Sequence, residues 1–198
     1  MARHKMREER TFVMVKPDGV KKGLIGELIR RFEQRDLKIV ALEMFHATKE
    51  QIDSHYPKDQ KWIERLGEKS LATYEKYGLD PVAELGTNDK AKIGPMVREW
   101  LVDYMIEAPL VRMVVEGVHA VDMVRKIIGP TMPVNADMGT FRGDYSSDSA
   151  AIANAEKRAI YNLAHASETA EEAQHEIEFW FGDHPIFDYT RFGVDQDV

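Results

Sequence analysis

Apolar positions follow two different spacings along the chain, and the spacings predict different elements. Continuous apolar runs, rich in β-branched and aromatic residues and bounded by turn signals, predict buried strands over residues 11–16, 37–45 and 109–115. Apolar residues spaced by three and four predict a helix that ends near residue 35 and two further helices at residues 120–128 and 170–181.

Two capping signals locate further helix starts. Thr48 is followed by Gln51, and Thr169 is followed by Glu172, the spacing of a capping box. The first signal predicts a short helix that runs to His55 and ends before a proline.

Residues 58–107 are the least regular part of the chain, with frequent glycines and a high density of charge. An apolar stripe predicts a helix near the end of this stretch. For the residues before that helix, we expect helices and loops packed over one end of the domain. A lid and an oligomer contact both fit such a segment. We expect its aromatic residues to fill a local core and not a ligand pocket: Trp62, Tyr74, Tyr77 and Trp100.

The second half holds another irregular stretch. We predict a polar loop over residues 131–145, a surface loop or cap over 146–154 and helical structure over 155–161. The tail after residue 185 carries three aromatic residues and should dock on its own domain or on a neighbouring subunit; they are Phe187, Tyr189 and Phe192.

The order of these elements is β-α-β-α, the irregular stretch, β-α, the loop, then β-α. This order predicts an α+β fold of the ferredoxin-like split βαβ type, with an antiparallel sheet and helices on one face. A chain of 198 residues fits a single domain with additional segments.

Composition excludes several classes of protein. The chain has no cysteine, which excludes disulfides, thiolate metal sites and cysteine nucleophiles and fits a cytoplasmic setting. A net charge of −7 argues against a protein built mainly to hold duplex DNA. No apolar run approaches the roughly 20 residues of a membrane span, and we do not expect the charged first ten residues to act as a secretory signal.

Candidate chemistry lies at a few polar residues near predicted strand and helix ends. Lys16 ends a buried strand, Arg142 lies between glycines, and His165 precedes the last helix. Glu176 falls on the edge of that helix's apolar face, where a neutral histidine would satisfy it and leave the other ring nitrogen free. Each residue alone has a structural explanation, as a strand terminus or a solvated surface charge. Together they suit phosphoryl transfer, although the chain contains neither the dinucleotide-binding motif G-x-G-x-x-G nor the P-loop motif G-x-x-x-x-G-K-[ST].

Several segments, in this order, resemble the nucleoside diphosphate kinase family. They are residues 10–20, which include Lys-Pro-Asp-Gly-Val, and residues 23–27, 31–34, 55–56, 139–144 and 162–167, which include Arg-Gly-Asp and Asn-Leu-Ala-His-Ala-Ser. The resemblance implies that His165 becomes a phosphohistidine, that Glu176 orients its ring and that Ser167 lies nearby. It also implies that six residues hold the phosphates and ribose of the nucleotide: Lys16, Tyr56, Arg125, Thr131, Arg142 and Asn162.

The same resemblance implies a ping-pong reaction. ATP or another nucleoside triphosphate phosphorylates the histidine, and a nucleoside diphosphate then takes the phosphoryl group. The resemblance further implies that Mg²⁺ is held mostly by the nucleotide phosphates and not by a protein site. A homo-oligomer, hexamer or tetramer, without membrane association is also implied.

The chain departs from the family pattern in two ways. Single residues differ at Met132, Met138, Ala166 and Glu168. Additional segments lie at about residues 58–107 and 145–158, and the first covers the place where the family stacks the base, for which Trp62 is the candidate here.

Two rival functions remain for comparison. A non-catalytic nucleotide-binding or regulatory module would have lost Lys16, Arg142 or His165, and all three are present. An RNA-binding ferredoxin-like sheet would need a basic face with exposed aromatic residues, against which the acidic balance and the apolar strands argue.

Overall fold

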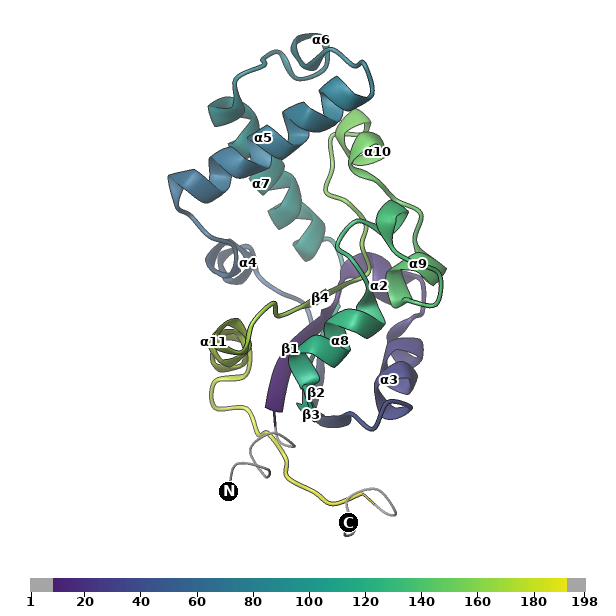
Figure 1. Ribbon diagram of the computed structural model, residues 1–198. Coiled ribbons are helices and arrows are strands. Elements are labelled where there is room, and N and C mark those ends of the chain that lie inside the picture. Colours follow the sequence, from purple (N-terminus) through teal and green to yellow (C-terminus); the bar gives the residue numbers. More distant parts are fainter. Residues whose placement is uncertain (1–8, 192–198) are drawn as a thin grey trace.

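The computed structural model describes residues 9–191 and is built on a four-stranded antiparallel sheet (Figure 1). Its strands lie in the order β2-β3-β1-β4, which is the order of a ferredoxin-like split βαβ fold. Their bounds are Glu9–Val15 for β1, Lys38–Phe45 for β2, Leu110–Gly117 for β3 and Ala164–Ala166 for β4. The predicted α+β class is confirmed.

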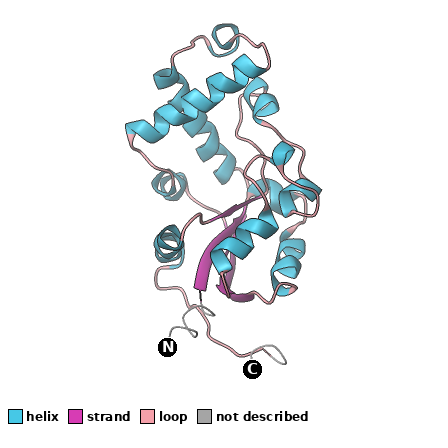
Figure 2. Ribbon diagram, viewed as in Figure 1, coloured by secondary structure: helices cyan, strands magenta, loops and turns pink. Residues whose placement is uncertain are grey.

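Helices cover both faces of the sheet, so the expectation of one covered face was wrong (Figure 2). Helices α3 (Ile25–Glu33) and α8 (Ala120–Ile128) pack on one face with Val13 and Val15. On the other face, Phe12 and Met14 pack with α4 (Lys49–His55) and α11 (Ala170–Phe181). The physical reason lies in β1, where consecutive apolar residues point to alternate faces and both sets must be buried.

The first irregular stretch forms a helical lobe above the sheet (Figure 1). It consists of α5 (Gln60–Lys76), α6 (Pro81–Leu85) and α7 (Lys90–Ile106). The backbones of α5 and α7 approach closely at Gly94, where a Cβ atom would lie 2.2 Å from the carbonyl oxygen of Ile63. Glycine is required there because any side chain would push the two helices apart.

The second irregular stretch joins this lobe through α10 (Ala150–Ala155). The Asn154 amide donates to the Ser70 carbonyl at 3.4 Å, and the Tyr74 hydroxyl donates to the Asn154 carbonyl at 3.4 Å. The lobe therefore combines segments about 80 residues apart in the sequence.

Short helices account for the remaining differences from the predictions. Helix α10 lies where a surface loop was predicted, because the Ser149 side chain caps it, and the left-handed Lys157 (φ 53°) follows its end. The helix predicted over 155–161 is therefore wrong. Pro17 begins α2 (Pro17–Lys21), and the predicted polar loop contains η1 (Pro133–Asn135) and α9 (Phe141–Tyr145).

The two capping predictions differ in outcome. Thr48 and Gln51 form the complete capping box of α4. Thr169 accepts from the Glu172 backbone N–H at 3.1 Å, but the Glu172 carboxylate accepts from the Glu168 N–H and leaves the second half of the box unmade.

The tail lies along β2 as far as Arg191. Its Phe187 N–H donates to the Val40 carbonyl at 2.8 Å, and the Tyr189 hydroxyl donates to the Ile39 carbonyl at 2.9 Å. Docking on its own domain is thus confirmed for this part, whereas Phe192 lies outside the described residues. None of the helices between residues 9 and 191 combines the length and apolar character that crossing a bilayer requires.

Candidate active site

The sheet brings His165 and Glu176 together as the sequence predicted. Strand β4 pairs His165 with Met14 of β1, on the face that α11 covers. His165 Nε2 lies 2.7 Å from Glu176 Oε1, and the Ser167 hydroxyl donates to Glu176 Oε2 at 2.6 Å. Both oxygens of the Glu176 carboxylate therefore have a hydrogen-bond partner, as a buried carboxylate requires.

These contacts fix the state of the histidine. Burial raises the pKa of Glu176, but the hydrogen bonds from His165 and Ser167 outweigh it and hold the pKa below its ordinary value. The ionised carboxylate can only accept, so Nε2 of His165 carries the proton. The lone pair of a neutral His165 then lies on Nδ1, the nitrogen that Glu176 does not engage.

A second histidine adjoins the first. The His55 and His165 rings meet edge to face with centroids 5.3 Å apart, and the Trp180 indole N–H donates to His55 Nδ1 at 3.3 Å. Burial lowers the pKa of His55 to about 3, so it is neutral. Among residues 9–191, one group of side chains could hold a metal ion. Its members are His55, His165 and Glu176, whose potential ligand atoms all lie within 4.8 Å of one another. Within this group, Nε2 of His165 already bonds to Glu176, and Nδ1 of His55 accepts from the Trp180 indole.

Three of the predicted phosphate ligands share one chain of hydrogen bonds. The Lys16 ammonium donates to Asn162 Oδ1 at 2.8 Å, and the Asn162 amide donates to the Thr131 carbonyl at 3.1 Å. Burial, together with the charge of Arg142, lowers the pKa of Lys16 to about 8. A buried cation with one hydrogen bond has donors left for an anionic ligand.

The two predicted arginines are occupied elsewhere and do not line the cavity. Arg142 is buried, and its guanidinium donates to the backbone carbonyls of Gly129, Asn162 and Ala164. Arg125 donates to the Glu168 carbonyl at 2.8 Å and pairs with its carboxylate at 3.4 Å. In this conformation, Arg142 holds the backbone before His165 and Arg125 holds the backbone after it.

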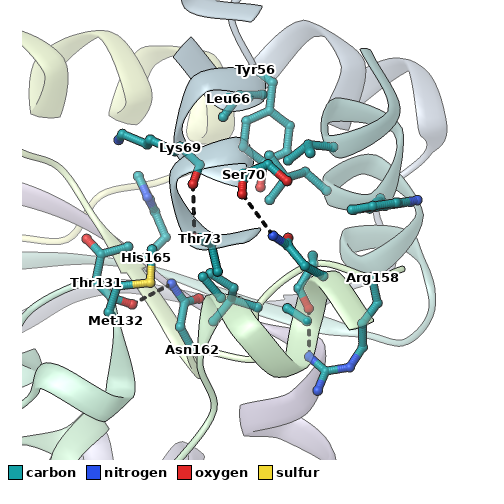
Figure 3. Close-up of a pocket in the computed structure, with 18 of the residues that line it drawn as sticks. Tyr56, Leu66, Lys69, Ser70, Thr73, Thr131, Met132, Arg158, Asn162 and His165 are labelled. Carbon is teal, nitrogen blue, oxygen red and sulfur yellow. Dashed lines mark hydrogen bonds between the residues drawn. The ribbon is translucent and has the colours of Figure 1, made fainter. Parts of the chain in front are cut away.

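A cavity of about 1150 Å³ opens above these residues (Figure 3). Its lining includes Lys16, Tyr56, Thr131, Asn162 and His165. The volume exceeds the roughly 300–1,000 Å³ of common small-molecule sites, so a nucleotide could fit.

Helix α5 supplies another wall of this cavity. Its lining residues recur at helical spacing, and Trp62 stacks on Tyr56 with centroids 6.1 Å apart and an interplanar angle of 27°. The expectation that the aromatic residues of this stretch form a local core holds for buried Tyr74. Trp100 packs against the core and also lines the cavity, whereas Trp62 and Tyr77 line the cavity. The helical spacing could have revealed this face, which includes Trp62, Leu66, Lys69, Thr73 and Lys76.

The comparison with known families agrees with this geometry. The model of the family described as nucleoside diphosphate kinase matches residues 9–64 and 92–186, which is most of the chain. The chain belongs to the nucleoside diphosphate kinase family. The predicted family and the predicted enzyme activity are confirmed.

Curated relatives and solved structures extend the match over nearly the full length. The nucleoside diphosphate kinase of Pyrobaculum aerophilum is 46% identical over 180 residues, covering 91% of this chain and 98% of the relative. That of Pyrococcus furiosus is 40% identical over 184 residues, covering 92% and 89%. A crystal structure of the NDP kinase from Pyrobaculum aerophilum matches with a TM-score of 0.86 and 44% identity, over 91% of this chain and all of that one.

A further solved structure bears on the chemistry. It is a transition-state mimic of the nucleoside diphosphate kinase from Borrelia burgdorferi with bound vanadate and ADP. It matches with a TM-score of 0.74 and 34% identity, over 94% of this chain and 95% of that one. The family match passes over residues 65–91, so most of α5, all of α6 and the start of α7 lie outside the common pattern.

Proposed function

We propose that His165 of this nucleoside diphosphate kinase carries the phosphoryl group on Nδ1. The observation that supports this choice is the hydrogen bond of Nε2 to Glu176, which leaves Nδ1 as the nitrogen with a lone pair. His165 is partly accessible and lies in the lining of the large cavity, so an incoming phosphate can reach it.

The reaction has two displacements at phosphorus. The Nδ1 lone pair attacks the terminal phosphorus of a nucleoside triphosphate, mainly ATP, and the bond to the bridging oxygen breaks as the nucleoside diphosphate leaves. A terminal oxygen of a second diphosphate then attacks the same phosphorus, the N–P bond breaks, and neutral His165 is restored. Glu176 stabilises the ring while Nδ1 carries the group, because its negative charge faces the Nε2 proton throughout.

We infer that the nucleotide phosphates and ribose are held by Lys16, Tyr56, Thr131 and Asn162 in the cavity. Arg125 and Arg142 would join them after exchanging their present carbonyl partners for phosphate oxygens. A guanidinium–phosphate pair is stronger than a bond to a neutral carbonyl, which favours that exchange.

The donor set of the cavity fits a magnesium ion carried by the nucleotide. Mg²⁺ prefers octahedral oxygen ligands, and among residues 9–191 the lining contains two carboxylates, Glu172 and Glu176. Glu176 is already engaged by His165 and Ser167. When bound, the ion neutralises charge on the phosphates, while the chain's own residues orient them.

The test is intact mass after incubation with ATP and magnesium, beside a His165→Ala variant. We expect one acid-labile phosphoryl group, removed by adding a nucleoside diphosphate and absent from the variant. An enzyme that binds ATP without gaining the group would be a non-catalytic nucleotide-binding module instead.

Three further properties are proposed with the function. We infer a single domain with additional segments at about 58–107 and 145–158, which the contact of α5 with α10 supports. A homo-oligomer, hexamer or tetramer, would cover the exposed Leu42 and Met44 of edge strand β2. A cytoplasmic location agrees with the lack of cysteine.

A further inference from the structure

The backbone immediately before His165 is held in a rare conformation. Leu163 is a fully buried leucine with a φ of 67°, and the Ala164 N–H donates to the Asn162 carbonyl at 2.8 Å. A hydrogen bond across a single residue of positive φ is the pattern of a γ-turn, which is uncommon and strained. Such a turn persists only when its surroundings hold it.

Asp18 is central to the surroundings of this turn. Its Oδ2 accepts from the Leu163 N–H at 3.0 Å, and the neighbouring Lys16 N–H donates to the Leu163 carbonyl at 2.9 Å. The backbone N–H and carbonyl of the strained residue Leu163 are therefore both hydrogen-bonded to residues 16–18. Gly19 completes the contact, because a Cβ atom there would lie 2.6 Å from the Leu163 oxygen.

The other oxygen of Asp18 is fixed from the helical lobe. Asp18 Oδ1 accepts a short hydrogen bond from the hydroxyl of Tyr104, a buried residue near the end of α7. The phosphoryl-transfer steps use neither residue. Each carboxylate oxygen of Asp18 therefore has a partner inside the protein.

The charge of Asp18 also acts on the cations of the site. Burial and the charge of Arg142 lower the pKa of Lys16, whereas the negative charge of Asp18 raises it. Asp18 likewise opposes the effect of burial on Arg142. Of the other groups around Lys16, Tyr104 lies with its ring 5.7 Å from the ammonium, and His55 is held neutral by burial.

We propose that Asp18 is a positioning residue of the phosphoryl transfer: it holds the turn at Leu163 that aims His165, and its charge acts on Lys16, whose backbone N–H bonds to the same turn. This inference rests on the proposed roles of His165 and Lys16. It gives the motif Lys-Pro-Asp-Gly a second function besides carrying the lysine.

The test compares Asp18→Asn with Tyr104→Phe by the rate of phosphoenzyme formation as a function of pH. Asp18→Asn removes the charge and leaves the Leu163 N–H facing an amide. We expect a loss of about ten- to a hundredfold at pH 7. The pH at which the rate falls off on the alkaline side, the alkaline limb of the pH–rate profile, should also move about one pH unit lower. Losing the negative charge favours neutral Lys16. Tyr104→Phe keeps the charge and the bond to Leu163, so its limb should stay in place.

Two controls separate the possible failures. In Lys16→Arg the limb should disappear, which assigns it to Lys16. If circular dichroism shows that Asp18→Asn does not fold, Asp18→Glu takes its place in the test. This variant keeps the charge and lengthens the side chain, so it should slow phosphoenzyme formation without moving the alkaline limb. An unmoved limb in folded Asp18→Asn, or a normal rate in Asp18→Glu, overturns the proposal. A wild-type enzyme without any phosphoenzyme would instead overturn the proposed function.

Discussion

Replacing Lys16 by methionine should stabilise the free protein while abolishing its activity. Burial, with the charge of Arg142, lowers the pKa of Lys16 from 10.5 to about 8. The folded state therefore binds this proton less tightly than the unfolded chain, and a protonated Lys16 lowers the free energy of unfolding at pH values below 8. The cost disappears as the pH rises from 8 towards 10.5.

The magnitude follows from the shift in pKa. At about 1.4 kcal/mol per pH unit, the cost is about 3 kcal/mol at pH 7 and less than about 1 kcal/mol at pH 10. Methionine keeps the apolar part of the side chain but loses the hydrogen bond to Asn162, which contributes about 1 kcal/mol. The net gain at pH 7 is about 2 kcal/mol, or about 4–8 °C in Tm for a chain of this size.

The assay is thermal unfolding at pH 7 and pH 10, with Lys61→Met as the control because Lys61 is exposed on α5. We expect Lys16→Met to melt higher than wild type at pH 7 and to lose that advantage at pH 10. Phosphoenzyme formation should be absent from this variant at both pH values. A lower Tm at pH 7, or a gain of the same size at both pH values, would show that burying the charge of Lys16 does not destabilise the fold.

Three other predictions test separate parts of the account. Glu176→Gln should slow phosphoenzyme formation about a hundredfold or more, because the fixed tautomer of His165 is lost; a normal rate in rapid-quench measurements would contradict this role. Trp62→Ala should raise the KM for nucleotides about three- to tenfold with little change in kcat, since it removes a stacking surface at the cavity; a fall in kcat alone would argue against that place for the base. Gly94→Ala should lower the free energy of unfolding by about 1–3 kcal/mol, while Gly26→Ala, where a Cβ meets open space, should not destabilise the protein; denaturant unfolding of the pair decides it.

Periodicity and capping revealed most of the elements because these signals are local. The buried runs at 11–16 and 37–45 match β1 and β2, and the cap at Thr48 begins α4 at the expected residue. Helix α10 was missed because the cap at Ser149 and the left-handed residue Lys157 outweigh the helical propensity of the residues that follow.

The pairing of His165 with Glu176 could be predicted from an acid on the edge of an apolar helix face. The carboxylate needed a partner once buried, and a histidine preceded the same helix by a few residues. The roles of the other site residues came from the resemblance to the family, not from the pattern of the chain.

Long-range contacts could not be read from the sequence. Asp18 meets Tyr104 and Leu163 across 86 and 145 residues, and no local pattern links them. The positive φ of Leu163 is equally hidden, because leucine does not favour that conformation. The present partners of Arg142 also depend on carbonyls that converge only in the folded chain.

The identity of the phosphorylated nitrogen is the most direct test of phosphoryl transfer through Nδ1 of His165. The phosphoenzyme formed with ATP and magnesium can be hydrolysed in base and its phosphohistidine isomers separated, beside the His165→Ala variant. We expect Nδ1-phosphohistidine that is absent from the variant, because Nε2 remains bonded to Glu176. Nε2-phosphohistidine, or a phosphoryl group that persists in the variant, would contradict it.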